Sequence, residues 1–174
     1  MPPPRRVSAG LVAAVFALAL LACRDSAAAP HSALYADRIL VEKSARRLTL
    51  LYQGRPVKSY RVALGHEPEG RKQCQGDDRT PEGLYRIDSR NAGSGYHRSL
   101  HVSYPNAADV ANARRRGCRP GGDIMIHGIK KGYGWVGSLH AQKDWTQGCI
   151  AVTDQEIEEI WSAVPNGTTV EIRP

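Results

Sequence analysis

The sequence predicts a mainly β fold, a β-rich α+β domain, over residues 37–174. Three observations lead to this prediction. Short apolar segments recur between clusters of Gly, Pro, Asn and Asp, which is typical of β-strands. Only two segments carry helix-capping signals. Strands do not alternate with helices along the chain, so a mainly β domain fits better than a doubly wound parallel sheet.

Eight strands are expected. The first two flank residues 44–46 and predict a hairpin, and the third ends at Gly65. The connection over residues 66–83 is long and rich in Gly, Pro and charge, which is typical of a functional loop. In chain order the expected strands are 38–42, 47–52, 57–64, 84–87, 100–103, 123–127, 149–152 and 168–172.

Two helices complete the predicted domain. Asn106 is a cap residue before a helix over 107–116, which Gly117 ends. Thr153 and Glu156 have capping-box spacing and predict a helix over 154–163. Apolar residues recur along one face of the second helix, which we therefore expect to pack on the sheet.

The N-terminus has the pattern of an export signal. Arg5 and Arg6 precede an uncharged apolar stretch over 7–22, which is too short for a membrane span. Leu20-Leu21-Ala22-Cys23 resembles a lipobox, which predicts a lipoprotein-type signal peptide over 1–22 and lipidation of Cys23. The alternative is simple cleavage near 27–29. Residues 23–36 are then a tether, and the protein is expected in the cell envelope or periplasm, anchored to a membrane by the lipid.

The charge favours anionic partners other than nucleic acid. The chain has 24 Lys and Arg against 17 Asp and Glu, a formal net charge of +7. The run Arg114-Arg115-Arg116 has no zinc-finger or RNA-binding motif beside it, so we interpret it as the solvated end of a helix.

The cysteines predict one disulfide and one free thiol. Export places the domain where disulfides persist. If Cys23 is lipidated, three cysteines remain. Cys74 and Cys118 lie in polar loops, which reach each other more easily than a cysteine at a strand end. We therefore expect a Cys74–Cys118 bridge and a free, reactive Cys149.

Two segments carry reactive groups. His127 ends an apolar strand and is followed by Gly128, and Cys149 follows Gly148 at the start of another strand. An imidazole can take the proton of a neighbouring thiol and make it a nucleophile. The backbone NH groups of Gly148 and Cys149 are candidate donors to an oxyanion.

These segments resemble the L,D-transpeptidase catalytic domain, also called the YkuD domain. Its pattern is His-Gly at a strand end followed by a Ser/Thr-x-Gly-Cys turn, which His127-Gly128 and residues 146–149 match. Residues 76–85, GDDRTPEGLY, resemble a further stretch of the family. The resemblance implies a mixed β-sandwich with a sheet-packed helix after Cys149.

The resemblance also implies an activity on the stem peptides of peptidoglycan. Cys149 would attack the carbonyl of a meso-diaminopimelate residue and release D-alanine, and the acyl group would pass to an amine or to water. His127 would act as general base and then acid, oriented by the Gly128 carbonyl. No metal or cofactor is implied.

Departures from the common pattern leave the direction of the chemistry open. Many members have a second His where this chain has Gln147, and an Arg where it has Ala151. This version resembles the YafK-like branch, which is linked to detaching an envelope lipoprotein from peptidoglycan by hydrolysis. Transpeptidation remains the first expectation and hydrolysis the alternative, with a lipoprotein as a further candidate partner.

Five residues near Cys149 are candidates for substrate binding: His140, Asp144, Trp145, Thr146 and Gln147. His140 either replaces the missing second His or is an exposed loop residue. Asp144 and Trp145 are expected to form a wall of the pocket. The alternative for Trp145 is a place in the core. Tyr96, His97 and His101 follow a Gly/Ser loop and are weaker candidates, and His66 is interpreted as an exposed loop residue.

Other classes fit less well. Sortase-like enzymes also place His before Cys, but with wider spacing and a later Arg, and papain-like peptidases have the reverse order. A non-catalytic envelope module with His127, His140 and Cys149 as zinc ligands is the remaining alternative, although these spacings match no common zinc pattern.

Overall fold

The computed structural model describes Met1 and residues 34–174. The expected signal peptide, Cys23 and the tether up to residue 33 lie outside the described residues. In the described part of the chain, no helix is both long and apolar enough to span a membrane.

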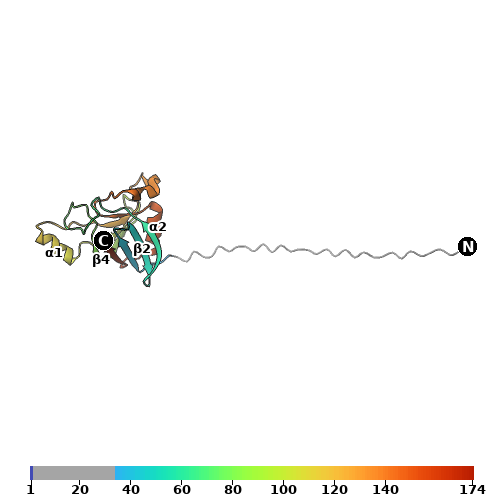
Figure 1. The fold of residues 1–174 in the computed structure, drawn as a ribbon, viewed down its shortest axis with the longest axis horizontal. Coiled ribbons are helices and arrows are strands. Elements are labelled where there is room, and N and C mark those ends of the chain that lie inside the picture. Colours follow the sequence, from blue (N-terminus) through green and yellow to red (C-terminus); the bar gives the residue numbers. More distant parts are fainter. Residues whose placement is uncertain (2–33) are drawn as a thin grey trace. The chain divides into compact units, whose positions relative to one another are not determined.

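The eight strands that the sequence predicts are present, and they form one curled sheet, part of which Figure 1 labels. The strand order is β3-β2-β1-β8-β4-β5-β6-β7. Two neighbouring pairs, β1 with β8 and β6 with β7, are parallel, and the others are antiparallel. The strands are β1 (Arg38–Glu42), β2 (Arg47–Tyr52), β3 (Arg55–Arg61), β4 (Gly83–Asn91), β5 (Ser99–Val102), β6 (Met125–His127), β7 (Ile150–Ala151) and β8 (Thr169–Arg173).

The two ends of this strand order meet. Just after β3, Ala63 pairs with Ala151 of β7 through reciprocal N–H···O bonds of 3.0 and 2.9 Å. A second bridge joins Gly65 to Thr146. The sheet therefore curls until the segment after β3 lies against the turn that precedes Cys149.

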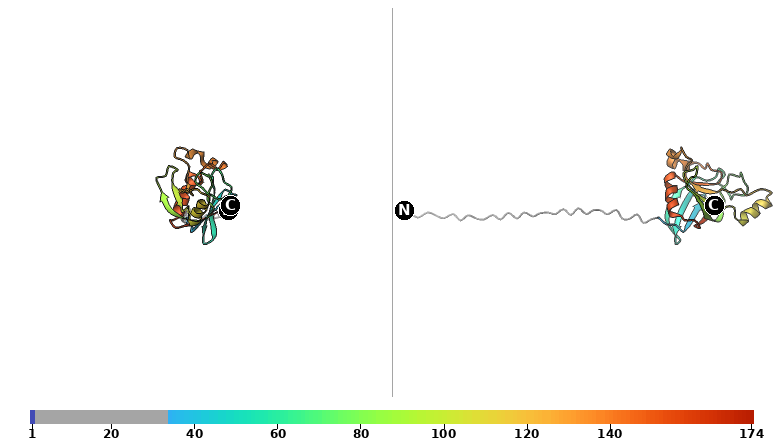
Figure 2. Two further views of the ribbon diagram at one scale, coloured as in Figure 1. Left: turned by 90° about the vertical axis from the view of Figure 1, so that its left-hand side faces the viewer. Right: turned by 180° about the vertical axis from the view of Figure 1, so that it is seen from behind.

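Both predicted helices are confirmed. Helix α2 (Asp154–Ala163) begins with the Thr153–Glu156 capping box and buries Ile157, Ile160 and Ala163 in the core. Helix α1 (Ala107–Arg115) begins with a capping box of Asn106 and Asp109. The two helices stand at opposite ends of the domain (Figure 2).

Element boundaries differ from the prediction at several places; β4, for example, extends to Asn91 rather than ending at 87. The third strand is Arg55–Arg61 rather than 57–64, and Val57, expected as an apolar position of it, is 42% exposed. The chain leaves β2 after Arg61 to bridge to β7, which buries Val62 and Leu64 outside the strand. The 3-10 segment η1 (Gly134–Gln142) was not expected, because its sequence has no helical periodicity.

Candidate active site

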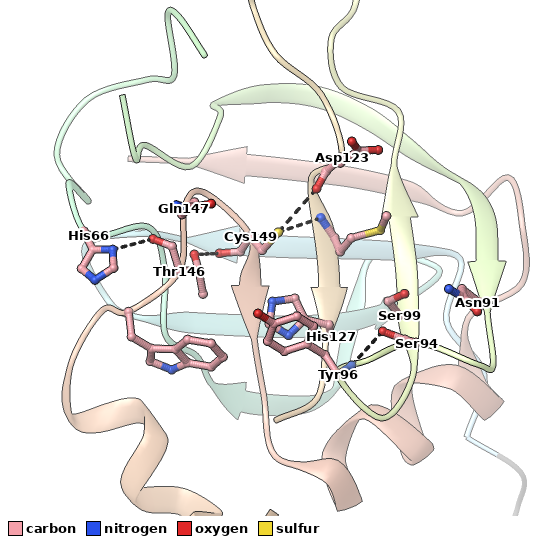
Figure 3. Close-up of a pocket in the computed structure, with 12 residues that line it drawn as sticks. His66, Asn91, Ser94, Tyr96, Ser99, Asp123, His127, Thr146, Gln147 and Cys149 are labelled. Carbon is pink, nitrogen blue, oxygen red and sulfur yellow. Dashed lines mark hydrogen bonds between the residues drawn. The ribbon is translucent and has the colours of Figure 1, made fainter. Parts of the chain in front are cut away.

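Strand pairing places His127 and Cys149 on one face of the sheet. Ile126 pairs with Ile150 in the parallel β6–β7 ladder, so Cys149 lies beside Met125. Because side chains alternate between faces, His127 and Cys149 point to the same side. Both line a cleft of about 600 Å³ (Figure 3).

The turn before Cys149 is held by Thr146. Its buried hydroxyl donates to the Cys149 carbonyl at 2.8 Å and accepts the Gly148 N–H at 3.1 Å. The Thr146 backbone donates to the Leu64 carbonyl and accepts the His66 N–H. These contacts fix the turn to the chain that follows β3.

Two glycines allow three backbone segments to meet under this turn. Gly148 has φ +124°, and a Cβ there would lie 2.6 Å from the Arg79 carbonyl oxygen. A Cβ on Gly65 would overlap the Asp78 carbonyl oxygen. The GDDRTPEGLY stretch therefore supports the cysteine turn through its backbone.

A carboxylate and a buried lysine hold that stretch in place. Asp77 accepts the N–H groups of Gln73, Cys74 and Arg79 and pairs with Lys72 at 2.8 Å. The desolvation of Asp77 works against ionisation, but these donors outweigh it and keep its pKa below the usual value. Lys43, 2% exposed, pairs with Glu82 at 2.7 Å.

His127 is oriented as a proton acceptor. Its Nδ1 lies 2.6 Å from the Gly128 carbonyl oxygen. A carbonyl can only accept, so Nδ1 carries the hydrogen and Nε2 of the neutral ring is free. Burial lowers the pKa of His127, which is 4% exposed, and so favours this neutral form.

Two aromatic rings enclose the imidazole. The Tyr96 ring centre is 4.6 Å from that of His127, and the Trp145 ring centre is 5.7 Å away. Tyr96 and Trp145 stack at 6.2 Å. These contacts limit the positions that the imidazole can take and exclude water from it.

The thiol of Cys149 is held by the chain entering β6. Sγ lies 3.5 Å from the Asp123 carbonyl, to which it donates, and accepts the Met125 N–H at 3.4 Å. Burial raises the pKa of Cys149, so the thiol is neutral at rest. Sγ and His127 are not hydrogen-bonded to each other in the structure, and burial favours the neutral form of both groups.

The oxyanion expectation needs a correction at Gly148. Its N–H already donates to the Thr146 hydroxyl, because the turn folds that hydroxyl back beneath it. The Cys149 N–H is therefore the remaining candidate among the two donors that the sequence suggested.

Trp145, Thr146 and Gln147 line the cleft, as expected for substrate-binding residues. Asp144 does not. It forms an ion pair of 2.8 Å with Arg46 and accepts the Leu64 N–H at 2.9 Å. Its position supports the loop, and no local pattern in the sequence indicates this partner 98 residues away.

His140 is neither exposed nor part of the cleft. It is 7% exposed and lines a separate, mainly apolar cavity of about 310 Å³ behind Trp145. Segment η1 turns the side chain inward, and burial lowers the pKa of His140. The expectation of an exposed loop residue is therefore wrong.

Cys74 and Cys118 form a disulfide in the structure, with Cα atoms 5.8 Å apart, and Cys149 is the free cysteine of the described residues. The disulfide joins the loop before the GDDRTPEGLY stretch to the loop before β6. Among the described residues, no cluster of three or more His, Cys, Asp or Glu is placed to hold a metal ion, so the zinc alternative has no support there.

Several residues of the cleft were missed or underestimated. Tyr96 lines it, whereas His97 pairs with Glu158 and His101 with Asp88 on the surface. His66 is exposed as expected, yet it also borders the cleft. Further lining residues with no signal in the sequence are Asn91, Ser94, Ser99, Asp123 and Met125.

Comparison with known proteins decides the family. A model of the L,D-transpeptidase catalytic domain matches residues 36–172. The chain belongs to this family. Its enzymes act on peptidoglycan.

Individual relatives share part of their length with this L,D-transpeptidase-family protein. The putative L,D-transpeptidase YafK of Escherichia coli K12 is 30% identical over 110 residues, 62% of this chain and 37% of YafK. The helical cell shape determining protein Pgp2 of Campylobacter jejuni is 26% identical with a TM-score of 0.61, over 78% of this chain and 46% of Pgp2.

A more distant structure shows the fold alone. The L,D-transpeptidase of Xylanimonas cellulosilytica is 18% identical with a TM-score of 0.53, over 83% of this chain and 63% of that chain. The chain spans less than half the length of YafK and Pgp2.

Proposed function

We propose that the protein is an L,D-transpeptidase that acts on peptidoglycan stem peptides through an acyl-enzyme on Cys149. The observation that carries the proposal is that the free thiol of Cys149 and the imidazole of His127, with its Nε2 unoccupied, lie in the same cleft on one face of the sheet. Membership of the family supports the substrate class.

The resting protonation states define the first step. The Cys149 thiol and the His127 imidazole are both neutral, so the thiol proton must leave the Asp123 carbonyl and move to His127 Nε2. Sγ then attacks the carbonyl of the diaminopimelate residue, and the Cys149 N–H holds the oxyanion.

The second half of the cycle returns the proton. The C–N bond to D-alanine breaks, and His127 gives its proton to the leaving amine. An amine of a second stem then attacks the thioester, His127 takes its proton, and the thiol is regenerated. Tyr96 and Trp145 keep the imidazole positioned throughout.

Hydrolysis of a bond between peptidoglycan and an attached protein or peptide is the second candidate. Two observations favour it. Gln147 and Ala151 stand where many family members have His and Arg, and the chain is similar to YafK. Water then takes the place of the acceptor amine, and the same two residues carry the reaction.

The experiment compares wild type with Cys149→Ala on purified sacculi and on tetrapeptide muropeptides, with products identified by mass. New cross-links or exchange of D-alanine by wild type alone would support transpeptidation. Loss of an attached peptide without new cross-links would support hydrolysis. Identical product profiles from both proteins would refute a Cys149 enzyme.

Export to the cell envelope and lipidation of Cys23 are also part of the proposal. The apolar stretch and lipobox-like residues before Cys23 support them. Labelling with palmitate should be lost in Cys23→Ala, and labelling that persists in this variant would contradict lipidation.

A further inference from the structure

Asp123 stands beside the candidate nucleophile. Its carbonyl accepts the Cys149 thiol at 3.5 Å, and Figure 3 shows it across Cys149 from His127. The residue borders both the cleft of about 600 Å³ and a second cavity of about 360 Å³. Cys149 lines both cavities as well, so Asp123 lies where they meet.

The Asp123 carboxylate has no partner among the described residues. Two other acids nearby are paired, Asp77 with Lys72 and Asp144 with Arg46, whereas Asp78 borders the smaller cavity without an ion pair among the described residues. Asp123 is the only carboxylate among the described residues that line the larger cleft. Asp123 is exposed, so its carboxylate is accessible to a ligand in the cleft.

The backbone gives Asp123 a defined position. Its φ of +57° lies in the left-handed region, which Asp and Asn tolerate better than most residues. The loop that carries it begins at Cys118 and is joined by the disulfide to Cys74. A tethered loop therefore places Asp123 at the edge of the cleft, with its carbonyl on Cys149.

A negative charge at this place hinders a cysteine nucleophile. Burial raises the pKa of Cys149, and the charge of Asp123 adds to that rise. The charge of this carboxylate thus disfavours the thiolate in the free enzyme. Its effect is reversed when a cation binds beside it, because neutralising the charge makes the thiolate easier to form.

We propose that the Asp123 carboxylate binds an ammonium group of the substrate, so that the enzyme prefers stem peptides with a free amine close to the reacting carbonyl. This inference rests on the proposed function and names a specificity-determining residue for it. The ammonium belongs either to the free end of the diaminopimelate residue under attack or to the acceptor stem that approaches the thioester.

The test compares wild type, Asp123→Asn and the control Asp88→Asn. Asn keeps the shape of Asp123 and tolerates its φ. Asp88 is a surface acid on β4, 47% exposed and paired with His101. The donors are a diaminopimelate tetrapeptide and the same peptide with its free side-chain amine acetylated. The first readout is the rate of acyl-enzyme formation on Cys149, measured by intact mass.

If the ammonium is on the donor, wild type and Asp88→Asn should acylate about tenfold or more faster with the free amine, a ratio expected for one charge-assisted hydrogen bond. Asp123→Asn should bring this ratio close to one. If the ammonium is on the acceptor, acylation is unchanged in Asp123→Asn, but transfer to an added stem amine falls relative to hydrolysis.

A second readout reports the effect of the charge on the thiol, and an unchanged melting temperature shows that the variant is folded. Iodoacetamide is uncharged, so it should alkylate Cys149 faster in Asp123→Asn than in wild type at the same pH. The proposal is overturned if Asp123→Asn leaves both the acylation ratio and the transfer ratio at their wild-type values. If wild type forms no acyl-enzyme on Cys149 at all, the proposed function itself fails, and this inference with it.

Discussion

Replacement of Gly148 by Ala should damage both stability and activity. The backbone there has φ +124°, which an L side chain rarely adopts, and the new Cβ would lie 2.6 Å from the Arg79 carbonyl oxygen. Both the added Cβ and the Arg79 carbonyl oxygen are fixed to the backbone, so neither can move aside as the end of a flexible side chain could. The turn or the segment at Arg79 must therefore shift, and Cys149 shifts with the turn.

The magnitude follows from these two penalties. Unfavourable φ and ψ values cost about 1–3 kcal/mol, and the overlap adds to this. We expect a loss of about 3 kcal/mol, which lowers the melting temperature by roughly 6–12 °C in a protein of this size. Turnover of a tetrapeptide should fall at least about tenfold, because displacement of the reacting groups is costly.

Gly54→Ala is the matched control. Gly54 has φ +76°, but a Cβ added there would have no other atom within 4 Å. This variant should lose only about 1 kcal/mol of stability, the cost of the backbone conformation alone, and keep its turnover. Thermal unfolding followed by circular dichroism measures the difference. Equal shifts in the two variants, or normal turnover in Gly148→Ala, would refute the argument.

Four further outcomes are expected. Thr146→Val removes the hydroxyl that joins the ends of the cysteine turn and should lower the free energy of unfolding by about 1–3 kcal/mol in urea titrations, whereas Thr146→Ser should restore it. Alkylation of Cys149 should keep rising with pH through and above the ordinary thiol range, because burial raises its pKa; a plateau at neutral pH would indicate an ion pair with His127 instead. Because the pKa of His127 is lowered in the folded protein, its imidazole is protonated at a higher pH in the unfolded chain than in the folded one. The contribution of His127 to stability is therefore present above its unfolded pKa of 6.5 and is lost as the pH falls. Urea titrations over this pH range should show a smaller loss on acidification in His127→Asn than in wild type, and equal losses would contradict the assignment. Finally, replacing Cys74 and Cys118 together by Ser should cost about 4 kcal/mol in the chain-entropy model, and unchanged stability would show that the bridge constrains little.

Local signals predicted the helices and the reactive pair. The capping boxes at Asn106 and Thr153 are contained within four residues, so the sequence shows them directly. His127 and Cys149 are marked by the glycines beside them: Gly148 allows the close approach of the Arg79 backbone, and Gly128 leaves room for the side chains of Asp154 and Ile157. The chemistry of these two residues could be inferred before their distance in space was known.

Contacts between distant segments could not be predicted. Nothing near Asp144 in the sequence indicates Arg46, and Lys43 shows no sign of being buried against Glu82. The bridge from Ala63 to Ala151 depends on how far the sheet curls, which no single strand determines. The role of Asp123 at the cleft depends on a left-handed backbone conformation that the residue type only permits.

The most direct test of the account is to find the covalent intermediate. Wild type is mixed with a diaminopimelate tetrapeptide, quenched in acid and analysed by intact mass and peptide mapping, beside Cys149→Ala and His127→Asn. The account predicts an adduct of the peptide minus D-alanine on Cys149 in wild type, no adduct in Cys149→Ala and much slower formation in His127→Asn. Turnover that survives in Cys149→Ala, or an adduct on another residue, would contradict it.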